Sequence, residues 1–329
     1  MTKPARRNHY LPQSYLAGFT ASGRKDDFLY VFDLESDDGR VEKRRPRNVA
    51  FEKDYHRLDW PGLPWDFLEN SVWARIESDL APIIQRVGRC EDVSGEDIDS
   101  LLQFVALCAV RVPPMRDAAT TMIEEASGSP LSHALTKEDA WQLILKWSAE
   151  KDLGWGEDEL RAAIRTPGLG KGRQQWWTFL NTAMNQDVML GELAKRNWRL
   201  WVASPGDAHF ICCDDPVSIF HAPPVMPYRH PRFDEPGTVV TFPLSRNTVL
   251  VGTFGSEEGI ADVPVKAVAH TNTGTMGSAR RFLYSPTDDF VWLGYGGRLL
   301  DWAACFDFRQ RCKLGERPSY IPPEYFEGI

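Results

Sequence analysis

The sequence of 329 residues contains no run of eighteen apolar residues, so no membrane-spanning helix is expected. Its six cysteines, at 90, 108, 212, 213, 305 and 312, do not have the paired spacing of a disulfide framework. We therefore expect reduced, mostly buried thiols and a cytoplasmic protein. The basic start, 1–7, leads into Tyr10, Leu11 and Pro12 rather than a continuous apolar stretch, so we expect no signal peptide.

Several motifs of common enzyme classes are also missing. The chain has no Walker loop, no dinucleotide fingerprint, no Gly-x-Ser-x-Gly and no His-Glu-x-x-His. Their absence disfavours nucleotide-driven, hydride-transfer and serine-hydrolase chemistry. A net charge of −8 argues against a surface that coats nucleic acid as a whole, although it leaves room for a local basic patch.

The pattern along the chain predicts a single α+β domain over 1–285. Aromatic and β-branched residues at 28–34 predict a strand, and a turn at 36–39 predicts a hairpin partner near Val41. Helical spacing dominates the middle, about 66–195, where Ser94 and Asp97 form a predicted capping box before the apolar run 98–112.

Short apolar runs separated by Pro, Gly and Asp follow at about 197–285. They predict a C-terminal, mostly antiparallel sheet, with one helix at 263–279. The last segment, 286–329, is aromatic without a clear period, and we expect an irregular tail packed on the domain.

His9 is the first candidate for chemistry. It precedes Pro12 and an apolar face at Tyr15, Leu16 and Phe19, so the N-terminus is expected to be buried and to hold one imidazole in place. Two interpretations stay open. The imidazole is a base or metal ligand, or it is a structural histidine that fixes the terminus to the core.

Asp214 and Asp215 form the second candidate, at a predicted strand end before Pro216. Such carboxylates bind a divalent metal or orient a histidine, but an aspartate before proline also caps a turn. The neighbouring Cys212 and Cys213 are adjacent, which does not match the spacing of zinc ligands. A divalent metal other than zinc therefore stays open as a cofactor.

Arg111 ends an otherwise apolar helix, where a guanidinium needs a partner. That partner is either an anionic ligand or a carboxylate of the chain; the candidates are Asp33, Glu69, Glu77 and Asp214.

The chain has one dense basic cluster, which suits contact with a phosphate backbone, although a solvated hairpin turn explains it with no partner. Its members are Arg40, Lys43, Arg44, Arg45 and Arg47.

The opening Asn-His-Tyr-Leu-Pro-Gln-Ser-Tyr-Leu-x-x-Phe resembles the signature of the bacterial family called domain of unknown function 4238. The order of later features is also similar. These features are 29–33, 48–50, 54–55, 111–113, 214–217, 242–245, Asn272 and 279–284. The family typically has Thr-Ser-Asp-Asn-Pro where this chain has Cys-Cys-Asp-Asp-Pro, so Asp214 stays a candidate but the hydroxyls do not. The resemblance implies a soluble bacterial or phage-associated protein and brings no established activity.

Two functional hypotheses follow. In the first, His9, Asp33, Arg111 and Asp214 converge in a site that hydrolyses a phosphoester, for example that of a nucleic acid. His9 is the base, Asp214 orients it or binds a metal, and Arg111 stabilises the anion. In the second, the protein is a non-enzymatic binding or effector module of a defence or regulatory system, and the His-Pro motif is structural.

Overall fold

The computed structural model describes residues 7–57, 65–66, 68–91, 93–115, 117, 158, 185–206, 208–221, 230–255, 257–294 and 297–313. The helices predicted for 136–149 and 157–164 lie outside this part apart from residue 158. Of the helix predicted for 174–193, residues 185–193 are described and are helical.

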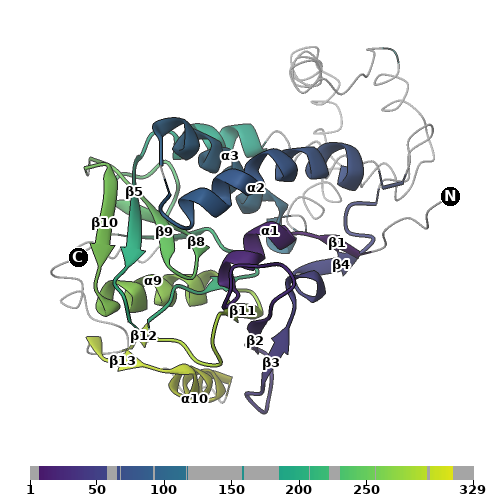
Figure 1. Cartoon of the computed structure of the whole chain (residues 1–329). Coiled ribbons are helices and arrows are strands. Elements are labelled where there is room, and N and C mark those ends of the chain that lie inside the picture. Colours follow the sequence, from purple (N-terminus) through teal and green to yellow (C-terminus); the bar gives the residue numbers. More distant parts are fainter. Residues whose placement is uncertain are drawn as a thin grey trace, which may run out of the picture.

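A five-stranded sheet forms the larger half of the fold (Figure 1). Neighbouring strands are antiparallel, except that β10 runs parallel to β5. This confirms the mostly antiparallel sheet predicted for the C-terminal part. In spatial order the strands are β10 (Gly259–Val263), β5 (Asn197–Ala203), β9 (Thr248–Thr253), β8 (Thr238–Ser245) and β7 (Ser218–His221).

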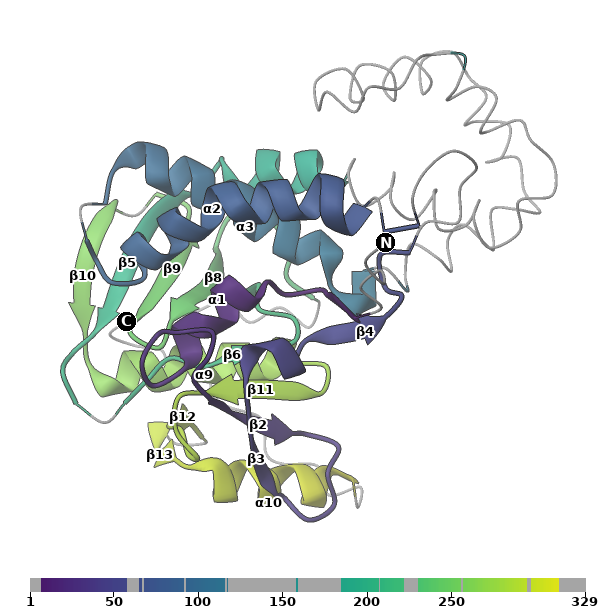
Figure 2. The same ribbon diagram turned by 45° about the vertical axis from the view of Figure 1, so that its right-hand side comes forward.

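Alternation along these strands gives the sheet two buried faces. Leu250 of β9 faces the main core, which it shares with α2 (Ala74–Val87) and α3 (Gly95–Arg111). Its neighbours Val249 and Val251 face the other way and pack with Val268 of α9 (Val265–Ser278). Helices therefore cover the sheet on both sides, as Figures 1 and 2 show.

The helical part begins with η3 (Leu68–Trp73), a π-helical turn that continues directly into α2. Ser94 caps α3: its hydroxyl accepts from the Asp97 amide, and Asp97 accepts from the Ser94 amide. The predicted capping box is confirmed.

A second, four-stranded antiparallel sheet combines strands from the N-terminal and C-terminal parts of the chain. The predicted hairpin is present as β2 (Leu29–Asp33) and β3 (Val41–Arg44). Strand β11 (Phe282–Ser285) pairs with β2 on one side and with β6 (Cys212–Cys213) on the other. The N-terminal hairpin is thus part of a sheet whose other strands come from the C-terminal half.

The segment after 286 is more regular than predicted. It forms a small pair of strands, β12 (Trp292–Leu293) and β13 (Leu299–Leu300), and then α10 (Trp302–Lys313). Trp302 packs edge-on against Phe32 at a centroid distance of 4.9 Å, which seats α10 on the four-stranded sheet. Up to residue 313 the described part of this segment is therefore regular where an irregular tail was predicted, because the apolar residues of α10 follow no clear helical stripe in the sequence.

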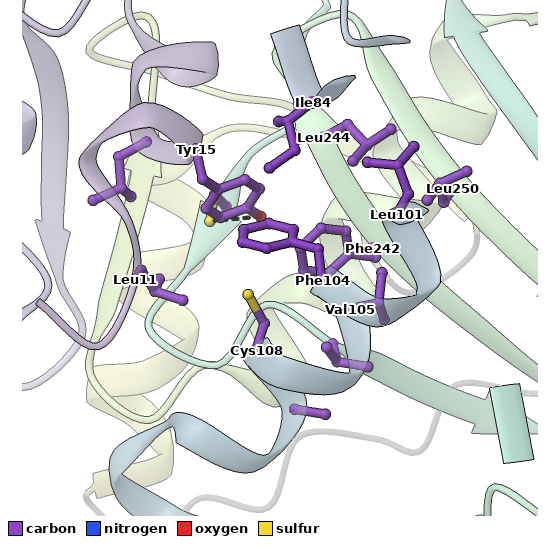
Figure 3. Packing of buried hydrophobic residues seen from close by; sticks show 14 of the residues in the cluster. Leu11, Tyr15, Ile84, Leu101, Phe104, Val105, Cys108, Phe242, Leu244 and Leu250 are labelled. Carbon is purple, nitrogen blue, oxygen red and sulfur yellow. Dashed lines mark hydrogen bonds between the residues drawn. The ribbon is translucent and has the colours of Figure 1, made fainter. Parts of the chain in front are cut away.

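The N-terminal motif is buried, as predicted. After β1 (Arg7–His9), the short helices α1 (Gln13–Leu16) and η1 (Ala17–Phe19) lie against α2 and β8. Figure 3 shows Tyr15 beside Phe104 and Phe242. The Tyr15 hydroxyl donates to the Pro243 carbonyl at 2.7 Å, so this buried phenol is satisfied. The motif therefore anchors the chain and fixes where His9 lies.

Candidate functional site

Strand β1 separates two polar regions. It pairs with β4 (Phe51–Lys53), so that Arg7, Asn8 and His9 lie opposite Lys53, Glu52 and Phe51. Because side chains alternate along a strand, Arg7 and His9 share one face and Asn8 occupies the other.

A basic cavity of about 440 Å³ lies on the Arg7 face of β1. No carboxylate lines it, and the cations are interleaved with two aromatic rings. The lining consists of Arg7, Phe28, Lys43, Arg44, Arg45, Arg47, Asn48 and Phe51. Four of the five residues of the predicted basic cluster are therefore here, and Arg40 is not among them.

The aromatic rings hold the cations in place. Arg7 stacks over Phe51 at 4.9 Å from the ring centroid, and Arg45 lies over Phe28 at the same distance. Lys43 lies over Phe28 at 5.4 Å. Such contacts orient cations without neutralising them, so the cavity keeps a strong positive potential. Arg44, by contrast, is paired with Glu42.

His9 lies against the wall of this cavity. Its ring is 5.7 Å from that of Phe51, and it has a hydrogen bond with the backbone of Arg47. Burial lowers the pKa of His9; the Arg47 contact opposes this, and the charges of Arg111 and Arg7 lower it further. Nε2 is buried and has no hydrogen-bond partner among the described residues. The imidazole is therefore neutral near pH 7 and retains an uncommitted nitrogen.

Arg111 contacts the backbone of His9 rather than its ring. One guanidinium nitrogen, Nη2, donates to the His9 carbonyl, and the other, Nη1, binds Glu77 Oε1 at 2.7 Å. The guanidinium is stacked over Trp73 at 5.2 Å and is only 3% exposed. Of the partners proposed for Arg111, Glu77 is the observed one, and the ion pair ties α2 and α3 to β1.

Glu69 and His56 complete this second polar region. His56 Nε2 lies 3.4 Å from the His9 carbonyl and 3.8 Å from Glu69 Oε2. The Asn8 side chain hydrogen-bonds Glu69 from β1. Burial and then Glu77 raise the pKa of Glu69 to about 7, although Arg111 and Asn8 act in the opposite direction. A carboxyl that titrates near neutrality is typical of functional sites.

Asp214 has a different environment. It is 5% exposed, and its carboxylate accepts backbone amides from Arg280, Arg281 and Phe282 at 2.9–3.1 Å. It therefore holds the turn that leads from α9 into β11. Burial raises its pKa despite these bonds, and the adjacent Asp215 has a pKa raised to about 7 by burial and by the Asp214 charge.

Asp33 lies on the other side of the same turn. It binds Arg281 through two hydrogen bonds of 3.0 and 2.8 Å at the surface. The four predicted site residues thus form two pairs, His9 with Arg111 and Asp33 with Asp214 through 280–282. Within the described residues no hydrogen bond or ion pair connects one pair to the other.

Within the part of the chain that the structure describes, no three His, Cys, Asp or Glu side chains are grouped to hold a metal ion. No helix there has the length and apolarity to cross a membrane. Burial raises the pKa of both Cys212 and Cys213, so these thiols are protonated and serve as core residues.

Comparison with known proteins identifies the family. A family model described as "Protein of unknown function (DUF4238)" matches residues 7–289. The chain belongs to this family. The DUF4238 match begins at Arg7 and so includes all of β1, together with the cavity and the Arg111 region. No curated protein and no solved structure matches this DUF4238 chain significantly.

Several residues of this candidate site were not predicted from the sequence. Asn8 and His56 were not among the candidates, and neither were Arg7, Phe28 and Phe51 of the cavity. Strand alternation in Arg-Asn-His was a usable signal for Arg7, since it places Arg7 beside His9. No local pattern marks His56, which meets β1 only through the tertiary fold.

Proposed function

We propose that this protein binds the phosphate groups of a nucleic-acid strand in the basic cavity, with His9 as the base for phosphodiester hydrolysis. The carrying observation is a cavity lined by Arg7, Lys43, Arg44, Arg45 and Arg47 and by no carboxylate. Guanidinium groups recognise phosphate through paired hydrogen bonds, and aromatic rings between cations are typical of sites for unpaired strands.

The net charge of the molecule also favours binding of a single strand in the cavity over contact between nucleic acid and the whole surface. The molecule carries a net charge of −8, so favourable interaction with a polyanion is confined to the cavity. The hydrolytic step requires that strand binding expose His9 Nε2, which is buried in the free protein. Nε2 then takes a proton from water, the water oxygen bonds to phosphorus, the leaving oxygen takes a proton from solvent, and His9 returns its proton to solvent. The neutral state of His9 supports its role as base.

Binding is tested with a fluorescent single-stranded ten-nucleotide oligothymidylate at several salt concentrations. The double variant Lys43→Ala/Arg47→Ala removes two cavity cations and should weaken binding at low salt by about tenfold or more, with a shallower salt dependence. The matched control is Lys195→Ala/Arg232→Ala, which removes the same charge from exposed sites paired with Glu192 and Asp234. Equal losses in both double variants would refute the cavity as the binding site.

Hydrolysis is tested on the same oligonucleotide, with ATP as a second substrate to separate a strand from a free nucleotide. If the wild type cleaves the strand, His9→Ala should slow cleavage by roughly 10²–10⁴-fold while binding persists. Binding without cleavage would leave the non-enzymatic module as the function of the same cavity.

A further inference from the structure

Adjacent residues of β1 contact the two polar regions that lie on either side of this strand. Arg7 lines the basic cavity, and the neighbouring Asn8 hydrogen-bonds Glu69 on the opposite face. Asn8 is 2% exposed, so protein rather than water lies between the cavity and the Glu69 carboxyl. Protein screens charges less than water does, and this strand is what separates an anion in the cavity from the Glu69 carboxyl.

Charged groups from three elements face Glu69. Arg111 comes from the end of α3, Glu77 comes from α2, and His56 follows β4. The Arg111 guanidinium is already paired with Glu77 at 2.7 Å. Glu69 Oε2 is buried without a hydrogen-bond partner among the described residues. Two carboxylates therefore share one guanidinium, and the second negative charge is poorly compensated.

We infer that Glu69 is a second ionisable group of the phosphate site and takes up a proton from solvent when a phosphate-bearing strand binds in the cavity. The inference rests on the proposed binding function. An ionised Glu69 repels the same anion that the cavity cations attract, and protonation removes that repulsion. By linkage, a bound anion must raise the affinity of Glu69 for its proton by the same factor.

Two properties, its hydrogen bond with Asn8 and its pKa, favour Glu69 over the other ionisable groups near β1. Its carboxyl titrates near pH 7, in the range in which the charge can change on binding. His9, with its pKa lowered below 6.5, stays neutral above that pH. Asp215 has a similar pKa of about 7, but burial and Asp214 dominate its surroundings and no hydrogen bond links it to β1 in the described residues.

The test is calorimetric titration of the full-length protein with the unlabelled oligothymidylate at pH 7.5, in two buffers of different ionisation enthalpy. The difference in apparent enthalpy gives the protons taken up, and phosphodiesters do not titrate in this range. A one-unit rise in the Glu69 pKa corresponds to about half a proton taken up and to a dissociation constant that rises up to about tenfold with increasing pH.

Glu69→Gln should abolish the uptake and flatten the pH dependence of binding between pH 6.5 and 8. Two variants serve as controls and should keep the wild-type uptake. Asp215→Asn removes the other carboxyl of similar pKa. Glu96→Gln makes the same change at the exposed far end of α3, about 22 Å from Arg111 at the helical rise.

The outcomes separate this inference from the proposed function. If the wild type does not bind the strand, the proposed function fails. If it binds through the cavity but takes up no proton, or if Glu69→Gln keeps the wild-type uptake, the inference about Glu69 is overturned. If Glu69→Gln does not fold, the pH dependence of uptake by the wild type decides: a maximum between pH 7 and 8 supports Glu69, and a maximum below 6.5 assigns the proton to His9.

Discussion

Asp214 and Asp33 both hold the turn at 280–282, but they differ in burial and in the groups that they bind. Asp214 is buried and accepts three backbone amides, which lose this acceptor if the carboxylate is removed. Asp33 binds a side chain, and its partner Arg281 is 47% exposed. A buried amide left unpaired costs far more than a solvated ion pair that is lost.

We therefore expect Asp214→Ala to lower the free energy of unfolding by about 3 kcal/mol or more, and Asp33→Ala by about 0–1 kcal/mol. Urea denaturation of both variants measures the difference. Any Asp214→Ala protein that folds should still bind the oligothymidylate, because Asp214 does not line the cavity. Equal destabilisation by the two substitutions would contradict the structural role of Asp214.

At the scale of elements, the junction between η1 and β8 depends on close backbone contact. A Cβ added at Gly18 would lie 2.9 Å from the Leu244 carbonyl oxygen and 3.2 Å from the Ser245 Cα. Both neighbours are backbone atoms, which cannot turn away as a side chain would. Gly191, within the helical residues 185–193, has no atom within 4 Å of an added Cβ.

The same Gly→Ala change should therefore alter the free energy of unfolding in opposite directions at these two positions. Gly18→Ala should lower the free energy of unfolding by about 1–3 kcal/mol through overpacking. Gly191→Ala should raise it by about 0.5–1 kcal/mol because alanine is the better helix former. Thermal and urea unfolding of both variants test this. A neutral Gly18→Ala would show that η1 can move away from β8 at no cost.

Elements with a strong local signal were predictable from the sequence, and contacts between distant elements were not. The capping box at Ser94 and the aromatic strand at 29–33 are determined within a few residues of sequence. Strand β10 was missed because its residues 259–262 are partly or fully exposed and do not alternate. The choice of Glu77 as the partner of Arg111 depends on how α2 lies against α3, which no local pattern encodes.

At the scale of the whole molecule, the expected pH dependence of stability follows from three buried groups of the described residues whose pKa values are strongly shifted. Burial raises the pKa of Asp215 from 3.8 to about 7 and that of Glu69 from 4.5 to about 7. Over this range the folded state holds more protons than the unfolded state, so the free energy of unfolding falls as the pH rises. His270 has the opposite effect: its pKa falls from 6.5 to about 4 on burial, so it destabilises the fold as the pH drops through that range.

The lowered pKa of His9 acts in the same direction as that of His270, but the two carboxyls together have the larger shifts, so stability should decrease between pH 5 and pH 8. Asp215→Asn removes one of the two contributions. Since the unfolded state ionises from about pH 3.8, part of the advantage of the variant is already present at pH 5, and this advantage should grow by about 2–3 kcal/mol between pH 5 and pH 8. His270→Gln should instead steepen the decrease, because it removes the opposing group. Urea denaturation at pH 5, 6.5 and 8 measures all three proteins. A difference between Asp215→Asn and the wild type that stays constant with pH would mean that packing, and not the ionisation of Asp215, sets the effect.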